Sequence, residues 1–474
     1  MHVPPQASTE GKIVVVGAGM AGLAAAHRLT ELAPHIEVVV LEARDRVGGV
    51  VATERTDGFV IERGPDSILT EKPWAVELAK RLGLAGELVG TLPGRGGSFV
   101  VARGKLERIP DGFALLAPTD LSALVFSPIL SWRGKARAAL DLALPRGAEG
   151  DDESLGSFVR RRFGKEVLDR LAEPLAGGIY GADPDRMSLR ATLPRFLDAE
   201  RRDRSVILGM RRTRRSVEGP SGGARYGLFV SFATGMQTLP DALEKVLGRR
   251  IHCGAECVAL ERVGERRWKI RLADSSVLEG NAVVLATPVD QAARLVGPFA
   301  PDLALLLGTI GLGSSVAVTL AWPRMAIDHP LDGYGFVVPR AEGRPLQAVT
   351  WASEKYPGRA PESVVLMRGF IGGVGRADFS RHADHELVSI ARTELRDLVG
   401  VRLEPVLERV DRYVRAMPRY EVGHLDLVDR IDRHVDALPS LGLAGNAYRG
   451  VGLPDTVHSG ERAAERVLAA MSEE

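Results

Sequence analysis

A glycine-rich turn between a buried strand and a helix constrains this chain more than any other feature of its sequence. Gly17-Ala18-Gly19-Met20-Ala21-Gly22 follows the β-branched run Lys12 to Val16 and opens a stretch rich in Ala and Leu. Glu42 ends the next apolar run, Ile36 to Leu41, and stands 20 residues after the last glycine of the turn. Strand, G-x-G-x-x-G turn, helix and strand with an acid at this spacing predict a dinucleotide-binding βαβ unit.

Each glycine of the turn has a physical role in holding a pyrophosphate. Gly17 permits the tight turn, Gly19 lets the phosphates approach the backbone, and Gly22 lets the helix pack closely on the strand. The N-terminus of the helix presents unpaired N–H groups and a partial positive charge to the phosphates. We therefore expect a Rossmann-like domain with the carboxylate of Glu42 on the ribose of a dinucleotide.

Two further segments favour FAD over NAD. The loop Glu42-Ala43-Arg44-Asp45-Arg46-Val47-Gly48-Gly49 continues the acid into arginines and a Gly-Gly pair, although a surface loop with incidental arginines is the alternative. An extended FAD needs such phosphate donors and a close backbone beyond the ribose. Near the other end of the chain, a glycine-rich turn at 445–452 lies between a strand at 441–443 and a helix at 454–471. The N-terminus of that helix would face the flavin ring.

The composition excludes several other classes of protein. With 62 basic and 61 acidic residues the net charge is +1, so we expect no nucleic-acid partner. Cys253 and Cys257 are too few for a disulfide scaffold, and two thiols alone rarely make a zinc site, so we expect no metal. Residues 1–10 lack the apolar region of a secretory signal, so we expect a cytoplasmic protein.

No apolar run approaches the ~20 residues that a membrane-spanning helix needs. The nearest stretch, Phe113 to Trp132, is broken by Pro118, Asp120 and Pro128. We interpret it as a core or substrate-lining segment, with contact to a membrane surface as the alternative.

Apolar periodicity predicts a helical middle followed by a second α/β portion. Helices are expected at Leu155 to Ala176 and Ala383 to Val399, and strands at Arg250 to Glu261, Val316 to Ala321 and Val364 to Phe370. Basic residues crowd the stretch from Arg201 to Arg215, for which a solvated face is favoured over an anion-binding surface. A flexible loop is expected at 219–223.

Three motifs carry a resemblance to a known family. GAGMAG, LEARDRVGG and GNAYRGVG resemble the amine oxidase and phytoene desaturase superfamily of flavoproteins. Within it, five further segments are similar to the porphyrinogen oxidases of haem synthesis: Ile61 to Ser67, Glu173 to Gly181, Ser205 to Met210, Ser231 to Leu239 and Met417 to His424. The resemblance runs in consistent order from about Lys12 to Leu468.

The resemblance implies an α/β fold in three parts. A Rossmann-like FAD-binding domain would take residues 1–74, 206–300 and 416–474. A substrate domain with a mixed sheet would take 75–110 and 301–415, and a helical insertion with a potential membrane contact would take 111–205.

The resemblance also implies the chemistry. A porphyrinogen would lose six electrons through three flavin reductions, and oxygen would take up the electrons as hydrogen peroxide. Because flavin N5 performs the chemistry, no catalytic side chain is expected. The partners would be the porphyrinogen and molecular oxygen, with weak contact to the inner face of a membrane left open. Monomer and homodimer both remain open.

Residue by residue, the resemblance assigns cofactor contacts to six parts of the chain. Val258 would lie by the adenine, and the residues from Asn446 onward would lie by the flavin. The expected contacts are Gly17, Ala18, Gly19, Met20, Ala21, Gly22, Glu42, Ala43, Arg44, Gly48, Gly49, Val50, Gly64, Pro65, Asp66, Ser67, Val258, Tyr413, Asn446, Val451, Gly452 and Leu453. Tyr413 stands where relatives usually carry tryptophan, which weakens its assignment.

Ser98 and Gly178 are the candidate substrate contacts. Ser98 stands where membrane-associated protoporphyrinogen oxidases often carry an arginine that faces a substrate carboxylate. Ser98, residues 130–141 and residues 205–210 are more similar to the soluble bacterial branch that oxidises coproporphyrinogen III. That substrate is therefore favoured, and protoporphyrinogen IX stays open. The favoured substrate carries four propionates rather than two, and Lys105 or the basic stretch could pair with them.

Three alternatives remain open at this point. An amine oxidase or carotenoid desaturase belongs to the same superfamily, although an amine site typically needs aromatic walls and only 5% of these residues are aromatic. A non-catalytic binding protein with the FAD fold is a second alternative, and an NAD-dependent dehydrogenase is a third.

Overall fold

One parallel sheet gathers strands from the beginning, the middle and the end of the chain. The computed structural model describes residues 11–114, 117–118, 121–147, 150, 152–217, 228–373 and 375–472. The sheet has five strands in the order β12-β2-β1-β16-β22, and every neighbouring pair is parallel. The strands are β12 (Ile251–Cys253), β2 (Glu37–Glu42), β1 (Lys12–Val16), β16 (Ala282–Leu285) and β22 (Leu441–Leu443).

Both faces of this sheet are buried because apolar side chains fill its central strands. In β1, Ile13 and Val15 belong to the core on one face, whereas Val14 and Val16 belong to the core on the other. Successive residues of a strand point to opposite faces, so a continuous apolar run needs helices on both sides. The covering helices are α1 (Met20–Leu32), α11 (Thr238–Leu247) and α17 (Leu453–Ser472) on one face, and α12 (Val289–Val296), α13 (Pro301–Gly308) and α16 (His424–Asp436) on the other.

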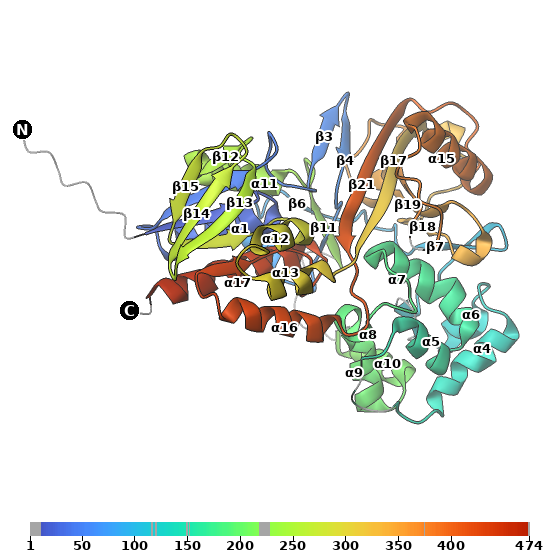
Figure 1. The fold of residues 1–474 in the computed structure, drawn as a ribbon. Helices are drawn as coiled ribbons and strands as arrows, with labels where there is room; N and C mark the ends of the chain where they lie inside the picture. The colour runs from blue at the N-terminus through green and yellow to red at the C-terminus, as the bar shows by residue number, and fades with distance from the viewer. Residues whose placement is uncertain are drawn as a thin grey trace, which may run out of the picture.

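Helices α1 and α17 approach closely because a glycine stands where they cross. A Cβ atom on Gly460 would lie 2.1 Å from the carbonyl oxygen of Ala21, a distance that real Cβ contacts do not reach. This contact fixes the C-terminal helix against the helix that follows the glycine-rich turn. Figure 1 shows the resulting lobe on the left, with α1, α12, α13 and α17 together.

Smaller elements complete this lobe. The helix α2 (Trp74–Arg81) packs against α17. The short strands form three sheets: β13 (Cys257–Gly264), β14 (Arg267–Leu272) and β15 (Val277–Gly280); β5 (Ile68–Leu69), β11 (Phe229–Phe232) and β6 (Leu88–Gly90); β3 (Thr53–Thr56) and β4 (Phe59–Glu62).

A seven-stranded mixed sheet forms the second part of the molecule. Its strands run in the order β21-β17-β20-β19-β18-β7-β8, and the β18–β7 pair is parallel among otherwise antiparallel neighbours. The helix α15 (Asp384–Val399) packs on one face. The strands are β21 (Leu407–Pro418), β17 (Leu312–Pro323), β20 (Val364–Ile371), β19 (Leu346–Trp351), β18 (Gly335–Val337), β7 (Phe99–Ala102) and β8 (Lys105–Arg108), and α14 (Ala352–Lys355) follows β19.

A helical third part lies below this sheet in Figure 1. Its core contains Val100 of the mixed sheet, so it packs on the face opposite α15. The elements are β9 (Phe113–Ala114), β10 (Ala117–Pro118), α3 (Leu121–Phe126), α4 (Trp132–Ala139), α5 (Leu155–Arg162), α6 (Lys165–Val167), α7 (Glu173–Tyr180), α8 (Leu189–Thr192), α9 (Pro194–Asp203) and α10 (Val206–Val217).

The structure confirms the predicted Rossmann-like lobe, mixed sheet and helical part, and it corrects two elements. The single strand predicted at Arg250 to Glu261 is wrong. Its first part, β12, joins the parallel sheet, the chain turns at Gly254 (φ +72°), and β13 joins a different sheet. The helix predicted at Leu155 to Ala176 is broken at Gly164 (φ +93°) and passes through a π-helical turn, Leu168–Ala172. The loop predicted at 219–223 lies outside the described residues.

We predict that Gly460→Leu destabilises the protein by about 1–3 kcal/mol, because the larger side chain forces α17 away from Ala21. The measurement is the free energy of unfolding in urea. Gly308→Ala is the control, since a Cβ on this exposed glycine at the end of α13 meets no atom within 4 Å. Equal stability of Gly460→Leu and the unaltered protein would contradict the close helix crossing.

Candidate functional site

Four segments meet at the edge of the parallel sheet where its strands end. Three of them contain predicted cofactor contacts, and the fourth contains the polar residue Thr287. Gly17 follows β1, Glu42 ends β2, Thr287 follows β16 and Gly445 follows β22. Because all of these strands run in the same direction, their carboxyl ends meet at one edge. Segments more than 400 residues apart in the sequence therefore form one candidate site.

The predicted Gly-Gly pair packs directly on the glycine-rich turn. The N–H of Gly48 donates to the carbonyl oxygen of Ala18 at 2.8 Å. A Cβ on Gly22 would lie 1.8 Å from the oxygen of Gly17, and one on Gly49 would lie 3.1 Å from the Cα of Gly19. Larger residues at these positions would separate the two loops, which explains why glycine stands at each of them.

The residues at this edge fit a dinucleotide. A Cβ on Gly19 would find no atom within 4 Å, so the first turn of α1 faces open space where a pyrophosphate would approach. Gly445 faces similar open space at a φ of +143°. The hydroxyl of Thr287 is buried and has no hydrogen-bond partner among the described residues. An unsatisfied buried hydroxyl at the edge of such a space is expected where a polar ligand binds.

Glu42 has a structural role that the sequence did not predict. Its carboxylate accepts hydrogen bonds from the N–H of Ala18 at 2.7 Å and from the N–H of Arg44 at 3.0 Å. Arg44 in turn donates to the oxygen of Gly49 at 3.2 Å. The acid expected on the ribose thus also ties the glycine-rich turn to the loop that follows it.

The segment predicted to contact the adenine lies beside this loop. The N–H groups of Gly254 and Ala255 donate to the carbonyl oxygens of Arg44 and Glu42, both at 2.8 Å. Val258 follows on β13 and is 37% exposed. The contact of Val258 with the adenine stays a prediction. Ala43 and Val50 of the loop are also exposed.

The Gly64–Ser67 segment packs on the same loop and is held by charge. A Cβ on Gly64 would lie 1.9 Å from the oxygen of Val50, so only glycine permits this approach. Asp66 pairs with Lys355 of the mixed-sheet part at 3.0 Å. Burial alone would raise the pKa of Asp66, but the Lys355 ammonium and the Ser67 hydroxyl hold it below its ordinary value. Asp66 is therefore ionised at neutral pH.

Two aromatic residues hold the turn near the C-terminal helix. The hydroxyl of Tyr420 donates to the oxygen of Asn446 at 2.8 Å and accepts from the N–H of Gly450 at 2.7 Å. The ring of His424 stacks on Tyr420 at 3.8 Å, and its Nε2 lies 2.7 Å from the oxygen of Tyr448. Burial lowers the pKa of His424, so the ring is neutral near pH 7. Tyr420 and His424 belong to the segment from Met417 to His424 that carries the family resemblance, but the sequence did not show that they hold this turn.

Val451, Gly452 and Leu453 complete this turn at the start of α17. The carbonyl oxygen of Gly452 accepts the N–H of Thr456 at 2.9 Å, which begins the helix. Asp455 accepts two hydrogen bonds at 2.7 Å from Lys72, which comes from the first lobe segment. The N-terminus of α17 is thereby fixed to the same lobe as the glycine-rich turn.

Tyr413 reaches the Gly64 segment from the mixed sheet. Its hydroxyl donates to the carbonyl oxygen of Arg63 and accepts from Arg368 at 2.6 Å. The sequence singled out Tyr413 and missed Arg368, because nothing local distinguishes an arginine within a predicted strand from a solvated one.

The mixed sheet leaves part of one face uncovered beside the cofactor edge. On that face Ala321 and Leu366 pack against β4 of the Rossmann-like lobe, and Val100 packs against the helical part. Between these contacts lie Ala348 and Phe370, which are paired across β19 and β20 and are only half-buried. Ala348 and Phe370 are thus apolar side chains that neither contact covers fully, and we call this part of the sheet the candidate substrate face.

The two predicted substrate contacts, Ser98 and Gly178, lie on different elements, and their contact with a substrate stays a prediction. A Cβ on Gly178 of α7 would meet no atom within 4 Å. Ser98 precedes β7, and its carbonyl oxygen accepts the N–H of Ile109 at 2.9 Å. Both α7 and β7 contact β18, which is what relates the two residues in space. Lys105 is exposed at the start of β8, and the residues from Arg201 to Thr213 lie on the helical part with exposed arginines.

Within the described ranges, no cluster of three or more His, Cys, Asp or Glu side chains is placed to hold a metal ion. In the same ranges, the helices that the structure places are all too short or too polar to cross a membrane.

We predict that Gly19→Asp abolishes FAD retention without loss of folding. Gly19 is the N-cap of α1 with φ −70° and ψ 176°, a conformation that aspartate favours, so the helix itself is not disturbed. The new carboxylate would instead repel the pyrophosphate. The measurements are the flavin absorbance of the purified protein and its unfolding curve, with Gly86→Asp as the control because Gly86 also faces open space. Bound FAD in the Gly19 variant would contradict the site.

Comparison with known proteins agrees with this geometry. The model of the flavin containing amine oxidoreductase family matches residues 20–468. The chain is 34% identical over 470 residues to the coproporphyrinogen III oxidase of Bacillus subtilis (strain 168), which covers 97% of this chain and 99% of that protein. It is 37% identical over 491 residues to the coproporphyrinogen III oxidase of Propionibacterium freudenreichii subsp. freudenreichii, with 97% and 91% covered.

A solved structure shares the whole fold. The crystal structure of an assigned protoporphyrinogen oxidase from Exiguobacterium sp. 255-15 matches with a TM-score of 0.84 and 33% sequence identity. The match covers 96% of this chain and 98% of that one. The resemblance noted in the sequence is thus confirmed over nearly the full length. The chain belongs to the family of flavin-containing amine oxidoreductases, and FAD is its cofactor.

Proposed function

We propose that this protein oxidises a porphyrinogen to a porphyrin in haem biosynthesis, with coproporphyrinogen III as the preferred substrate. The observation that carries the proposal is the similarity of nearly the whole chain to two proteins named coproporphyrinogen III oxidase, at 34% and 37% identity. The candidate substrate face, with half-buried Ala348 and Phe370, would suit a flat macrocycle. Protoporphyrinogen IX is kept as a second candidate substrate, because the similar structure from Exiguobacterium is named a protoporphyrinogen oxidase.

The overall reaction removes six electrons and six hydrogens from the macrocycle. Three molecules of oxygen accept them and leave as three molecules of hydrogen peroxide. When bound, FAD accepts electrons from the substrate two at a time and passes them to oxygen. The protein supplies binding and orientation, so no acid or base from the chain is assigned.

Different candidate cofactor residues would bind different parts of FAD. The glycine-rich turn and the N-terminus of α1 receive the pyrophosphate, while Glu42 receives the ribose. Gly64 to Ser67 and the turn from Asn446 to Leu453 hold the flavin end, and Tyr420 and His424 keep that turn in shape. These assignments are supported by the shared edge of the sheet and by the open space at Gly19.

The sheet face supplies the orientation of the substrate. Ala348 and Phe370 present a flat apolar floor, and Gly178 on α7 leaves room because it lacks a side chain. A macrocycle held there would be fixed against the flavin face, which removes the orientational part of the barrier. An amine oxidase or a desaturase would use the same floor for a narrower substrate.

We predict that coproporphyrinogen III is turned over with a higher kcat/KM than protoporphyrinogen IX, and that Ser98→Arg reverses or narrows this difference. An arginine at this position would add a charged hydrogen bond worth about 1.5–3 kcal/mol to a substrate carboxylate. The measurement is porphyrin fluorescence with each substrate, and Lys245→Gln, at an exposed position of α11, is the control. An unchanged ratio in Ser98→Arg would remove Ser98 from the substrate site. Oxidation of amines or phytoene in preference to either porphyrinogen would overturn the function.

We also propose that the protein is cytoplasmic and that its helical part rests weakly on a membrane surface. Phe126 is 82% exposed, Trp132 is 73% exposed and Val125 is 59% exposed, all where α3 and α4 meet. The Lys135 ammonium donates to the carbonyl oxygen of Val125, so a basic group lies at the same tip. Exposed apolar side chains beside a basic group are typical of interfacial membrane contacts.

We predict that the unaltered protein sediments with vesicles containing anionic lipid, and that Phe126→Ser combined with Trp132→Ser abolishes this binding. Turnover of dissolved porphyrinogen should be unchanged, because the tip lies outside the sheet face. Met325→Ser, which removes an apolar side chain that is 90% exposed on the mixed-sheet part, is the control. Failure of the unaltered protein to bind such vesicles would exclude the membrane contact.

A further inference from the structure

Arg368 is a buried cation in the middle of the mixed sheet. It lies on β20 and is 7% exposed. Its cross-strand neighbours are Thr319 on β17 and Thr350 on β19. Leu366 and Phe370 occupy the same face of the same strand, two residues away on either side. Along β20, Arg368 therefore lies between Leu366, which contacts the Rossmann-like lobe, and Phe370 of the candidate substrate face.

The guanidinium bridges two residues that are candidate cofactor contacts. Its Nη1 donates to the carbonyl oxygen of Gly64, and its Nη2 donates to the hydroxyl of Tyr413 at 2.6 Å. Its Nε is buried without a hydrogen-bond partner among the described residues. Both of its bonds go to neutral oxygens, so they leave the positive charge in place.

Other charges at this contact between the two parts have ion-pair partners of opposite sign, and Arg63 also lies 3.6 Å from Glu54. Each pair across the contact joins a residue of segment 54–66 in the Rossmann-like lobe to a residue of the mixed-sheet part. The pairs are Arg63–Asp411 at 2.6 Å, Arg409–Glu54 at 2.8 Å, Lys355–Asp66 at 3.0 Å and Arg359–Glu62 at 3.6 Å. For Arg368, no carboxylate of the described residues lies within 4.0 Å, so its counter-ion is not among these partners.

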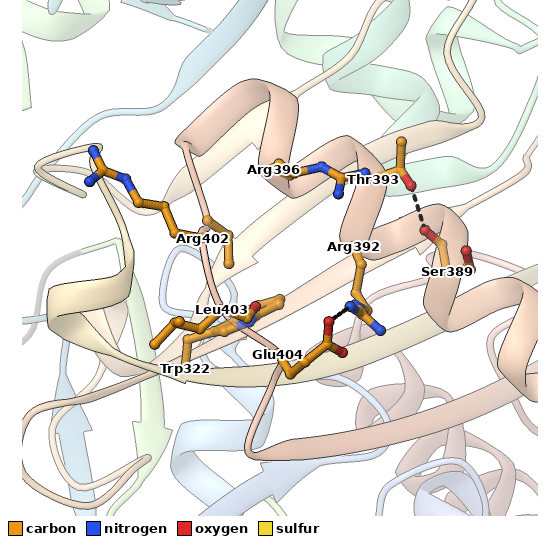
Figure 2. Close-up of a pocket in the computed structure, with 9 residues that line it drawn as sticks. Trp322, Ser389, Arg392, Thr393, Arg396, Arg402, Leu403 and Glu404 are labelled. Carbon is orange, nitrogen blue, oxygen red and sulfur yellow. Dashed lines mark hydrogen bonds and ion pairs between the residues drawn. The ribbon is translucent and has the colours of Figure 1, made fainter.

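Arginines on the opposite face of the sheet show what ordinary surface cations look like in this protein. A hollow of about 220 Å³ lies there, lined by Trp322, by α15 and by residues 401–404. Figure 2 shows Arg392 bonded to Glu404 in this hollow, and Arg402 pairs with Asp328. The third arginine, Arg396, is exposed and water solvates it. Arg368, in contrast, is buried and has no ion-pair partner within 4.0 Å among the described residues. Asp66, whose pKa the charge of Arg368 helps to lower, is already paired with Lys355.

A buried charge with no directly paired counter-ion is unfavourable, so such a group persists where a bound ligand completes it. The ligand must carry negative charge during at least part of the reaction. Two-electron reduction adds negative charge to the cofactor ring, and Gly64 and Tyr413 connect Arg368 to the segments that hold this ring. The counter-ion that best fits these contacts is the cofactor in its reduced form.

We propose that Arg368 is a positioning residue whose fixed positive charge stabilises the reduced cofactor and thereby raises its midpoint potential. A fixed charge in a dry site acts strongly because no solvent has to reorganise around it. The proposal rests on the assignment of FAD to this site and is independent of which porphyrinogen is oxidised.

The test is the midpoint potential of the bound cofactor, measured on the holoenzyme under anaerobic conditions with no porphyrinogen present. Arg368→Met should weaken the preference for reduced over oxidised cofactor at least tenfold, which is a fall of about 30 mV for a two-electron couple. Arg368→Lys keeps the charge and should lose less. Arg396→Gln, on the opposite face, should leave the potential unchanged.

Three results would overturn the proposal. The first is an unchanged potential in Arg368→Met. The second is an equal fall in Arg368→Met and Arg368→Lys, which would assign the effect to the hydrogen bonds. The third is an unchanged potential with a raised KM for coproporphyrinogen III, which would pair Arg368 with a substrate carboxylate. If Arg368→Met does not fold, Arg368→Gln takes its place, because its amide keeps a donor for Gly64.

Discussion

The parallel pairing of β1, β2, β16 and β22 is the constraint on which the candidate site depends. These strands come from three distant parts of the chain, yet their carboxyl ends meet at one edge. A slip of one residue in β1 would exchange Ile13 and Val15 with Val14 and Val16 between the two cores. The apolar pattern therefore fixes the register, which aligns Val16, Leu285 and Leu443, so the turns that contain Gly17 and Gly445 begin at the same edge. The buried side chains of β1 therefore position the candidate site, although they do not line it.

The parts of this arrangement that could be predicted are those whose cause is local. A strand, a glycine turn and a helix in direct succession have one physical explanation, so Gly17, Gly19 and Glu42 could be singled out from the sequence. The break between β12 and β13 could not, because both halves have strand-like residues and the turn at Gly254 becomes necessary only once β12 pairs with β2. Strand β21 was not predicted because charged residues blur its alternation, and helix α16 was missed although Val428, Ile431 and Val435 recur at helical spacing.

The substrate side was harder to predict because no single segment contains it. The candidate substrate face is the part of the mixed sheet that the Rossmann-like lobe and the helical part leave uncovered. Its extent depends on how these three parts pack together. Arg63 and Arg409 look like solvated surface residues in the sequence, but they pair with Asp411 and Glu54 across the contact between two parts. Lys105 and the basic stretch, for which a solvated surface was favoured over contact with substrate carboxylates, are largely exposed.

The same ion pairs affect the electrostatic role that is proposed for Arg368. Exposed pairs contribute little to stability, but several of them spanning one contact restrict how far the two parts can move apart. Arg368 lies among these pairs on a central strand, so it cannot turn toward water when the cofactor carries no extra charge. Its position is fixed before reduction occurs, and the cost of burying it is met when the protein folds rather than during turnover. A rigid contact between the two parts is therefore a condition for an electrostatic role of Arg368, and the paired residues around it meet that condition.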